Sequence, residues 1–244
     1  LLLLCKAEVL LSMNEKSSAM NILTSIEGIQ NLPAMIATLV ALTELTSDSN
    51  AYLKHCESEG ASLEFMDREA YKHQKYSDEL ISYLNKTWLS VPEGGASELV
   101  FNGGLEIISV DMDFDIIALA QGTTTTSLGV LLSSKPPTEV WAFPVLKGFD
   151  SISEMDALAR KFNYTNEWLV AKSRLKCFEA YHFSGYAKNQ EALNAAINDL
   201  KIDGNFNLDP IYTAKAFIGM ISELQQIKQP KKVLFIHTGG VLPI

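Results

Sequence analysis

The chain has 244 residues, of which 47% are hydrophobic and 20% are charged, which is typical of a folded protein with a sizeable core and excludes a disordered chain. Its 20 basic and 29 acidic residues give a net charge of −9, which repels nucleic-acid phosphates and anionic lipids. We therefore expect neither a nucleic acid nor a membrane as partner. The three cysteines (Cys5, Cys56 and Cys177) form no CxxC pair, so we expect a reduced compartment and a cytoplasmic protein.

The chain opens with the leucine-rich segment LLLLCKAEVLL. No basic residue precedes the segment, Lys6 and Glu8 interrupt it, and no small-residue cleavage site follows, so export and a membrane span both fit it poorly. The first residue is not Met. We interpret Leu1 as a point inside a longer gene product or as an artificial edge of the sequence, and expect the N-terminal region to be incomplete.

Short apolar runs alternate with helical patterns along the chain. Strands are predicted at 62–66, 88–91, 116–120, 139–146 and 232–237. Helices are predicted at 32–45, 51–59, 78–85, 97–108, 124–132, 151–162, 190–200 and 212–227. Ser151 and Glu154 have the spacing of a capping box at the start of the helix over 151–162. This alternation predicts an α/β fold with mainly parallel sheets, in which binding sites gather at the carboxyl ends of strands.

The apolar run at 116–120 continues through a glycine and four threonines into an apolar helix. Gly122 allows a sharp turn, the first helical amides point at one spot, and the helix dipole favours an anion there. The alternative is a threonine-rich surface loop. Because no lysine follows as in a P-loop and GxGxxG is absent, the pattern favours the phosphate of a monophosphate cofactor over a nucleotide.

Six ordered motifs carry a resemblance to a known family. They read LEFMDREAY (63–71), VPEGG (91–95), QGTTTTSL (121–128), HFSGYAK (182–188), DPIYTAK (209–215) and FIHTGG (235–240). In order and approximate spacing they resemble the pyridoxal-phosphate enzymes that include 1-aminocyclopropane-1-carboxylate deaminase and D-cysteine desulfhydrase. The resemblance implies a two-domain α/β fold of the tryptophan-synthase-β type (type II), with 22–95 as the smaller domain. Residues 1–21 and 96–244 would form the larger, cofactor-binding domain.

The resemblance implies pyridoxal 5′-phosphate as the cofactor and assigns roles to residues of this chain. The phosphate loop would consist of Gly122, Thr123, Thr124, Thr125 and Thr126, and the cofactor site would also include Asn31, Thr213 and Thr238. The family usually has a second glycine where Thr124 stands and a small residue where Gln121 stands.

Two tyrosines match residues that lie near the substrate in this family, Tyr186 and Tyr212. The alternative for both is an amphipathic packing role with the hydroxyl at the surface. Thr213 follows Tyr212 where the deaminases usually have glutamate near the pyridine nitrogen, as in the desulfhydrase-like branch. A neutral hydroxyl does not hold that nitrogen protonated as a carboxylate does, so we expect a weaker electron sink and elimination chemistry.

The lysine that carries the cofactor in this family would fall near position 3, which is Leu3 here, and the nearest lysine is Lys6. Three explanations stay open. Lys6 serves through a local shift, the N-terminal sequence is missing or misrepresented, or the chain is a degenerate member that binds without turnover. Without such a lysine, the usual base for the substrate's α-proton is also lost.

The resemblance as a whole implies a deaminase or lyase that acts on a small amino acid, 1-aminocyclopropane-1-carboxylate or D-cysteine, and releases ammonia and a 2-oxo acid. It also implies a homodimer. The alternatives are a non-catalytic member that binds pyridoxal phosphate or an amino acid, and an unrelated α/β protein that binds another monophosphate. We expect no metal, because no Cys, Asp or Glu stands at metal-ligand spacing from His182 or His237.

Overall fold

A computed structural model of the chain describes residues 38–42, 54, 57–58, 62–66, 97–109, 111–185, 190–199 and 208–238. The chain divides into two compact units. The described residues up to 66 belong to one unit, and those from 97 onward belong to the other. The domain boundaries expected from the resemblance stay a prediction.

In the first unit, strands β1 (Thr38–Leu42) and β2 (Ser62–Met66) pair in parallel, with Thr38 opposite Ser62 and Leu42 opposite Met66. The strand predicted at 62–66 is confirmed. The helix predicted over 32–45 is wrong at 38–42, because this short apolar run has a parallel strand partner that local periodicity does not reveal. Residues 54, 57 and 58 are helical, whereas the elements predicted at 78–85 and 88–91 lie outside the described residues.

The second unit contains a parallel sheet with strand order β5-β4-β3-β6. All six residues of the inner strand β3 are buried, as expected for a strand covered on both faces. The predicted strands at 116–120, 139–146 and 232–237 are confirmed with small shifts of their ends, while β5, only three residues long, was not predicted. The strands are β3 (Ile116–Gln121), β4 (Glu139–Pro144), β5 (Leu175–Cys177) and β6 (Val233–Ile236).

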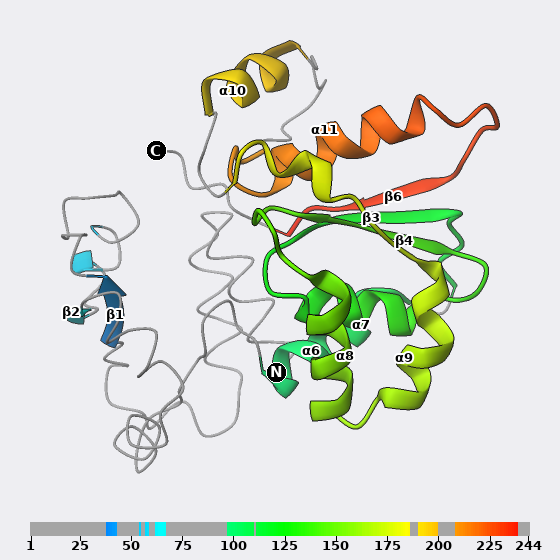
Figure 1. Cartoon of the computed structure of the whole chain (residues 1–244), viewed down its shortest axis with the longest axis horizontal. Helices are drawn as coiled ribbons and strands as arrows, with labels where there is room; N and C mark the ends of the chain where they lie inside the picture. Colours follow the sequence, from blue (N-terminus) through cyan, green and yellow to red (C-terminus); the bar gives the residue numbers. More distant parts are fainter. Residues whose placement is uncertain are drawn as a thin grey trace. The chain divides into compact units, whose positions relative to one another are not determined.

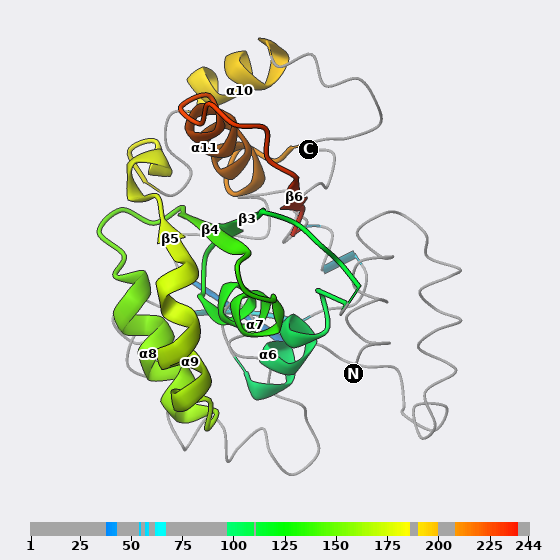
Figure 2. The same ribbon diagram turned by 90° about the vertical axis from the view of Figure 1, so that its right-hand side faces the viewer.

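Helices cover both faces of this sheet (Figures 1 and 2). Helices α6 to α9 lie on one side of the sheet, and α11 lies on the other with α10 beside it. The helices predicted at 97–108, 124–132, 151–162, 190–200 and 212–227 are confirmed with shifts of their ends, but α9 and two short 3-10 segments were not predicted. The helices are α6 (Glu98–Leu105), α7 (Thr125–Ser133), α8 (Ser151–Lys161), α9 (Thr165–Ala171), α10 (Gln190–Asp199) and α11 (Thr213–Leu224); the 3-10 segments are η4 (Lys172–Arg174) and η5 (Glu179–His182). In the part of the chain that the structure describes, every helix is too short or too polar to cross a bilayer.

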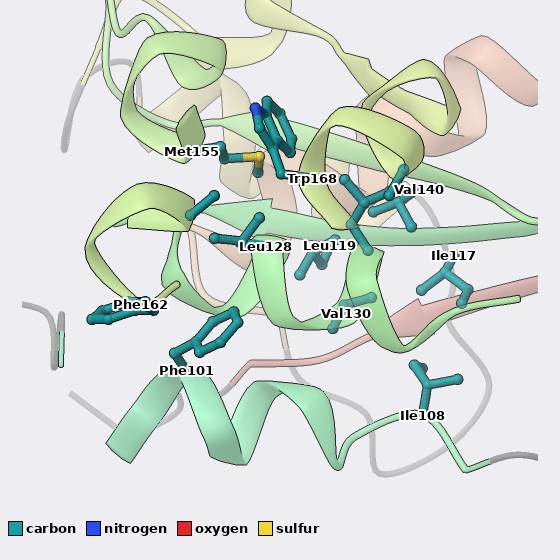
Figure 3. Close-up of a cluster of buried hydrophobic side chains, with 13 residues drawn as sticks. Phe101, Ile108, Ile117, Leu119, Leu128, Val130, Val140, Met155, Phe162 and Trp168 are labelled. Atoms are coloured by element: carbon teal, nitrogen blue, oxygen red, sulfur yellow. The ribbon is translucent and has the colours of Figure 1, made fainter. Parts of the chain in front are cut away.

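The two faces of β3 enter two different cores, because successive side chains of a strand point to opposite faces. Ile117 and Leu119 join the core beneath α7, α8 and α9, which also contains Trp168 (Figure 3). Ala118 and Ala120 face α11 on the other side of the sheet. The α/β fold with a parallel sheet that the sequence predicts is confirmed.

Helices α6 and α7 cross at a pair of glycines, Gly104 and Gly129. A Cβ atom added to Gly129 would lie 2.6 Å from the carbonyl carbon of Gly104, so only glycine permits this approach. The crossing packs α7 against α6.

The carboxyl end of α7 is held by Arg174. The guanidinium donates hydrogen bonds to the carbonyls of Leu131 (3.0 Å), Ser134 (3.1 Å) and Thr138 (2.9 Å), and to the Ser134 hydroxyl (2.8 Å). A cation at this position complements the negative end of the helix dipole. Arg174 thus fastens α7 to the segment that leads into β5.

The cap of α8 differs from the prediction. Asp150, rather than Ser151, caps the helix, and its carboxylate accepts hydrogen bonds from the Ser153 amide (3.0 Å) and hydroxyl (2.7 Å). Ser151 is buried, and its hydroxyl accepts a hydrogen bond from the side-chain amide of Gln121 at 2.6 Å. The predicted capping box of Ser151 and Glu154 is therefore wrong, because a contact with β3 takes the serine hydroxyl away from the helix end.

Candidate functional site

The candidate site begins at the carboxyl end of β3, where Gly122, Thr123 and Thr124 connect the strand to α7. Thr124 and Thr125 are buried, Gly122 and Thr126 are half-buried, and Thr123 is exposed. The Thr125 amide donates to the Thr123 carbonyl, and the Leu128 amide donates to the Thr124 carbonyl at 2.9 Å. Two of the four threonines are therefore buried rather than at the surface.

The amino end of α7 lacks the internal capping seen at two neighbouring helices. Its N-cap residue, Thr124, makes no side-chain capping hydrogen bond, whereas the carboxylates of Asp150 and Asp209 accept amide hydrogen bonds at the starts of α8 and α11. The amides of Thr126 and Ser127 lie in the first helical turn, where an α-helix supplies no acceptor of its own. Among the described residues these two amides have no backbone acceptor, so they can donate to an anion.

The Thr125 hydroxyl is the second unusual feature of this helix end. The residue is fully buried, and its Oγ1 has no hydrogen-bond partner among the described residues. A buried unsatisfied hydroxyl costs about 1–3 kcal/mol. This cost and the uncapped helix end indicate a site built to receive a hydrogen-bonding ligand.

Tyr212 lies directly against this loop. A Cβ atom added to Gly122 would meet Cε1 of the Tyr212 ring at 3.1 Å and its hydroxyl oxygen at 3.8 Å. The structure therefore brings together two predicted site residues that are 90 positions apart in the sequence.

Asp209 organises the segment that carries Tyr212. Its Oδ1 accepts hydrogen bonds from the amides of Ile211 (2.9 Å) and Tyr212 (2.8 Å). Its Oδ2 accepts from the amide of Thr213 (2.9 Å) and the Thr213 hydroxyl (2.6 Å). Asp209 is buried, and all four contacts are made at the start of α11. No role is predicted for Asp209 from the sequence, although an aspartate just before a helix is a recognised N-terminal signal.

Thr213 is fully buried and uses its hydroxyl locally. The hydroxyl donates to Asp209 and accepts a hydrogen bond from the Asp209 amide at 2.9 Å. A hydroxyl has one proton and two lone pairs, so one lone pair remains. Any further partner of Thr213 must therefore donate the hydrogen bond.

Lys215 is a second buried charged residue near the start of α11. Its ammonium donates to the carbonyls of His182 (3.0 Å) and Gly185 (2.7 Å). Between these carbonyls, Phe183, Ser184 and Gly185 all have left-handed backbone angles, with φ values of 50°, 70° and 115°. Burial lowers the pKa of Lys215, while the charge of Asp209 opposes that shift. No local sequence pattern predicts this contact, because its acceptors lie about thirty residues away.

Gln121 stands where the resemblance expects a small residue, but its side chain lies on the α8 side of the sheet. Its amide nitrogen donates to Ser151, and its Oε1 has no partner among the described residues. Gly122, the next residue, faces Tyr212 on the α11 side. The glutamine therefore does not occupy the space between the loop and Tyr212.

The other predicted site residues are placed as follows. Thr238 is exposed and comes two residues after β6, which runs parallel to β3 with Ile236 opposite Leu119, so Thr238 follows the sheet edge from which Gly122 emerges. The remaining three, Lys6, Asn31 and Tyr186, lie outside the described residues.

Comparison with curated proteins finds several that are similar to this chain. It is 27% identical over 191 residues to a putative 1-aminocyclopropane-1-carboxylate deaminase of Pyrococcus furiosus, which covers 71% of this chain and 57% of that protein. It is 28% identical over 163 residues to the D-cysteine desulfhydrase of Klebsiella pneumoniae strain 342, covering 62% of the chain and 49% of the relative. It is 27% identical over 212 residues to the mitochondrial bifunctional D-cysteine desulfhydrase/1-aminocyclopropane-1-carboxylate deaminase of Arabidopsis thaliana, covering 75% and 50%.

The chain is similar to 1-aminocyclopropane-1-carboxylate deaminases and D-cysteine desulfhydrases.

A solved structure described as an ACC deaminase homologue superposes with a TM-score of 0.62 at 22% identity, covering 84% of this chain and 66% of that one. This likeness shows that the two proteins share a fold. The chain spans about half the length of the curated relatives it matches. No protein-family model matches the chain.

Proposed function

We propose that the amino end of α7 binds the phosphate of pyridoxal 5′-phosphate, and that the chain serves a deaminase or lyase reaction on a small amino acid. The buried, unpartnered Thr125 hydroxyl at an uncapped helix end carries this proposal. The names of the relatives suggest 1-aminocyclopropane-1-carboxylate or D-cysteine as substrate. The resemblance of the motifs implies ammonia and a 2-oxo acid as products.

The residues of this helix end fit a phosphate group. Amides of the first turn point out of the helix, and the helix dipole places partial positive charge at the same end. Thr125 Oγ1 adds a hydroxyl donor that has no other partner among the described residues. The half-buried Gly122 leaves the loop backbone without a side chain beside Tyr212.

Pyridoxal phosphate, when bound, supplies an electron sink for negative charge that develops on the amino acid. The protein has to hold the phosphate, fix the orientation of the bound molecules and exclude water. The α7 amides and Thr125 would hold the phosphate. Tyr212 forms the wall beside Gly122 and would orient the bound molecules there. With its proton bound to Asp209, Thr213 would accept a hydrogen bond from any group that faces it.

The resemblance adds several parts to this proposal. Asn31 and Thr238 would contact the cofactor, Tyr186 would lie near the substrate, and Lys6 is the available candidate for the cofactor-bearing lysine. A homodimer and a cytoplasmic location complete the proposal.

The test is the affinity of the purified chain for pyridoxal phosphate, measured by absorbance titration. Thr125→Val keeps the shape of the side chain but removes its hydroxyl, so we expect binding about tenfold weaker, which corresponds to about one hydrogen bond to a charged group. Because the lost hydroxyl has no partner in the described structure, the variant should unfold at the same urea concentration as wild type or a higher one.

Gly122→Val forces a larger side chain towards Tyr212 and should abolish binding. Ser133→Ala is the matched control, because this serine lies at the opposite end of α7 and bonds only to carbonyls of its own helix among the described residues. Equal affinity in wild type, Thr125→Val and Gly122→Val would refute the proposed site.

A further inference from the structure

The start of α11 combines a buried carboxylate with a residue that lines the proposed site. Three consecutive amides, those of Ile211, Tyr212 and Thr213, donate to the carboxylate of Asp209 at 2.8–2.9 Å. The Thr213 hydroxyl donates to the same carboxylate at 2.6 Å. Asp209 is 6% exposed, so these bonds are largely shielded from water.

These contacts fix the backbone on which Tyr212 stands. The Tyr212 amide is bonded to Asp209 Oδ1, and both neighbouring residues in the chain are bonded to the same carboxylate. A Cβ atom at position 122 would lie 3.1 Å from the Tyr212 ring, closer than ordinary van der Waals contact, so the ring lies directly beside Gly122. A change at Asp209 is therefore transmitted to the loop through Tyr212.

We propose that Asp209 is a positioning residue for the α7 ligand site: by binding three amides at the start of α11, its carboxylate holds the Tyr212 ring against Gly122. This proposal deepens the proposed function and rests on it for the identity of the ligand. The placement of the ring itself is a property of the ligand-free chain.

Asp150 provides a matched control. It also caps a helix with its carboxylate, at the start of α8, where it accepts from the Ser153 amide and hydroxyl. None of its described hydrogen bonds involves Tyr212 or the loop over 122–126. Asp150→Asn therefore reports the general effect of neutralising a capping aspartate.

The first measurement needs no ligand. We would record ¹⁹F NMR spectra of the full chain labelled with 3-fluorotyrosine and assign the Tyr212 signal with Tyr212→Phe. In Asp209→Asn, whose amide group replaces one acceptor with a donor, the Tyr212 signal should shift or broaden. In Asp150→Asn it should stay in place. An unchanged Tyr212 signal in Asp209→Asn would overturn the proposal, whatever the ligand proves to be.

The second measurement is a double-mutant cycle on pyridoxal phosphate affinity. Asp209→Asn should weaken binding about tenfold in the wild-type background, the effect of about one charge-assisted hydrogen bond, and should have little further effect in Tyr212→Ala. If the losses of binding free energy caused by Asp209→Asn and Tyr212→Ala add in full in the double variant, Asp209 acts independently of Tyr212 and the proposal is refuted. If wild type binds no pyridoxal phosphate, the proposed function fails, while the fluorine spectra still decide the role of Asp209.

Discussion

A substitution at the crossing of α6 and α7 tests how α7, the helix that follows the loop over 122–124, is held in place. In Gly129→Ala, the new Cβ would lie 2.6, 2.8 and 2.9 Å from the Gly104 carbonyl carbon, the Gly104 Cα and the Leu105 nitrogen. All three are main-chain atoms, so the helices must move apart. Such overpacking costs up to about 3 kcal/mol, and the better helix propensity of alanine offsets about 1 kcal/mol. We expect the free energy of unfolding to fall by about 2 kcal/mol, the difference between these two contributions.

The partner glycine supplies the control for this prediction. In Gly104→Ala, the nearest atom to the new Cβ is the Gly129 Cα at 3.3 Å, a tight contact that a small movement relieves. The gain in helix propensity offsets this smaller strain, so the variant should stay within about 0.5 kcal/mol of wild type. Urea unfolding followed by tryptophan fluorescence measures both variants, because Trp168 lies in the core beside α7. Equal stability of Gly129→Ala and Gly104→Ala would refute this account of the crossing.

Three further predictions concern polar side chains that are buried or half-buried. Arg174→Ala should lower the free energy of unfolding by about 2–3 kcal/mol, because it removes the guanidinium donor from the carbonyls of Ser134 and Thr138 and one of two donors from that of Leu131. Arg174→Lys should recover only part of this loss, since one ammonium cannot reproduce the guanidinium fork. A fully stable lysine variant in urea unfolding would contradict this. Burial lowers the pKa of Lys215, so between this lowered value and the ordinary lysine pKa the unfolded chain binds more protons, and the free energy of unfolding should rise with pH across that window. Lys215→Met should flatten that rise in urea titrations at several pH values, and an unchanged slope would refute the assignment. Burial raises the pKa of the Cys177 thiol, and the charges of Glu179 and Asp150 add to this shift. Iodoacetamide at pH 8 should therefore label Cys177 more slowly in the folded chain than in the unfolded chain, as measured by peptide mass spectrometry. Equal labelling rates would contradict the shift.

The part of the site that the sequence predicts well is the strand-loop-helix segment. An apolar run, a glycine and a threonine-rich helix start are contiguous, so their local preferences are enough to place Gly122 and Thr125. The helix predicted from residue 212 is also confirmed, because its pattern is likewise contiguous in the sequence. Its first residue is Thr213.

Contacts across long sequence distances could not be predicted in this way. Either Asp150 or Ser151 could cap α8, and the choice depends on a hydrogen bond from Gln121, thirty residues earlier. The strand at 38–42 depends on a partner more than twenty residues later. The role of Lys215 depends on two carbonyl groups in a left-handed turn that no local pattern connects with α11.

The row of small residues along one face of β3 sets how closely α11 packs against the sheet. The row therefore offers a means of changing the width of the proposed site. Ala118 and Ala120 are buried against α11, where Ala216 belongs to the same cluster, and Gly122 continues the row to Tyr212. A side chain larger than alanine at position 118 or 120 would move α11 away from the sheet, and Tyr212 would move with the helix. Directed evolution of ligand preference could therefore vary positions 118 and 120, neither of which has to contact the ligand. The loss of stability would increase with the displacement of α11.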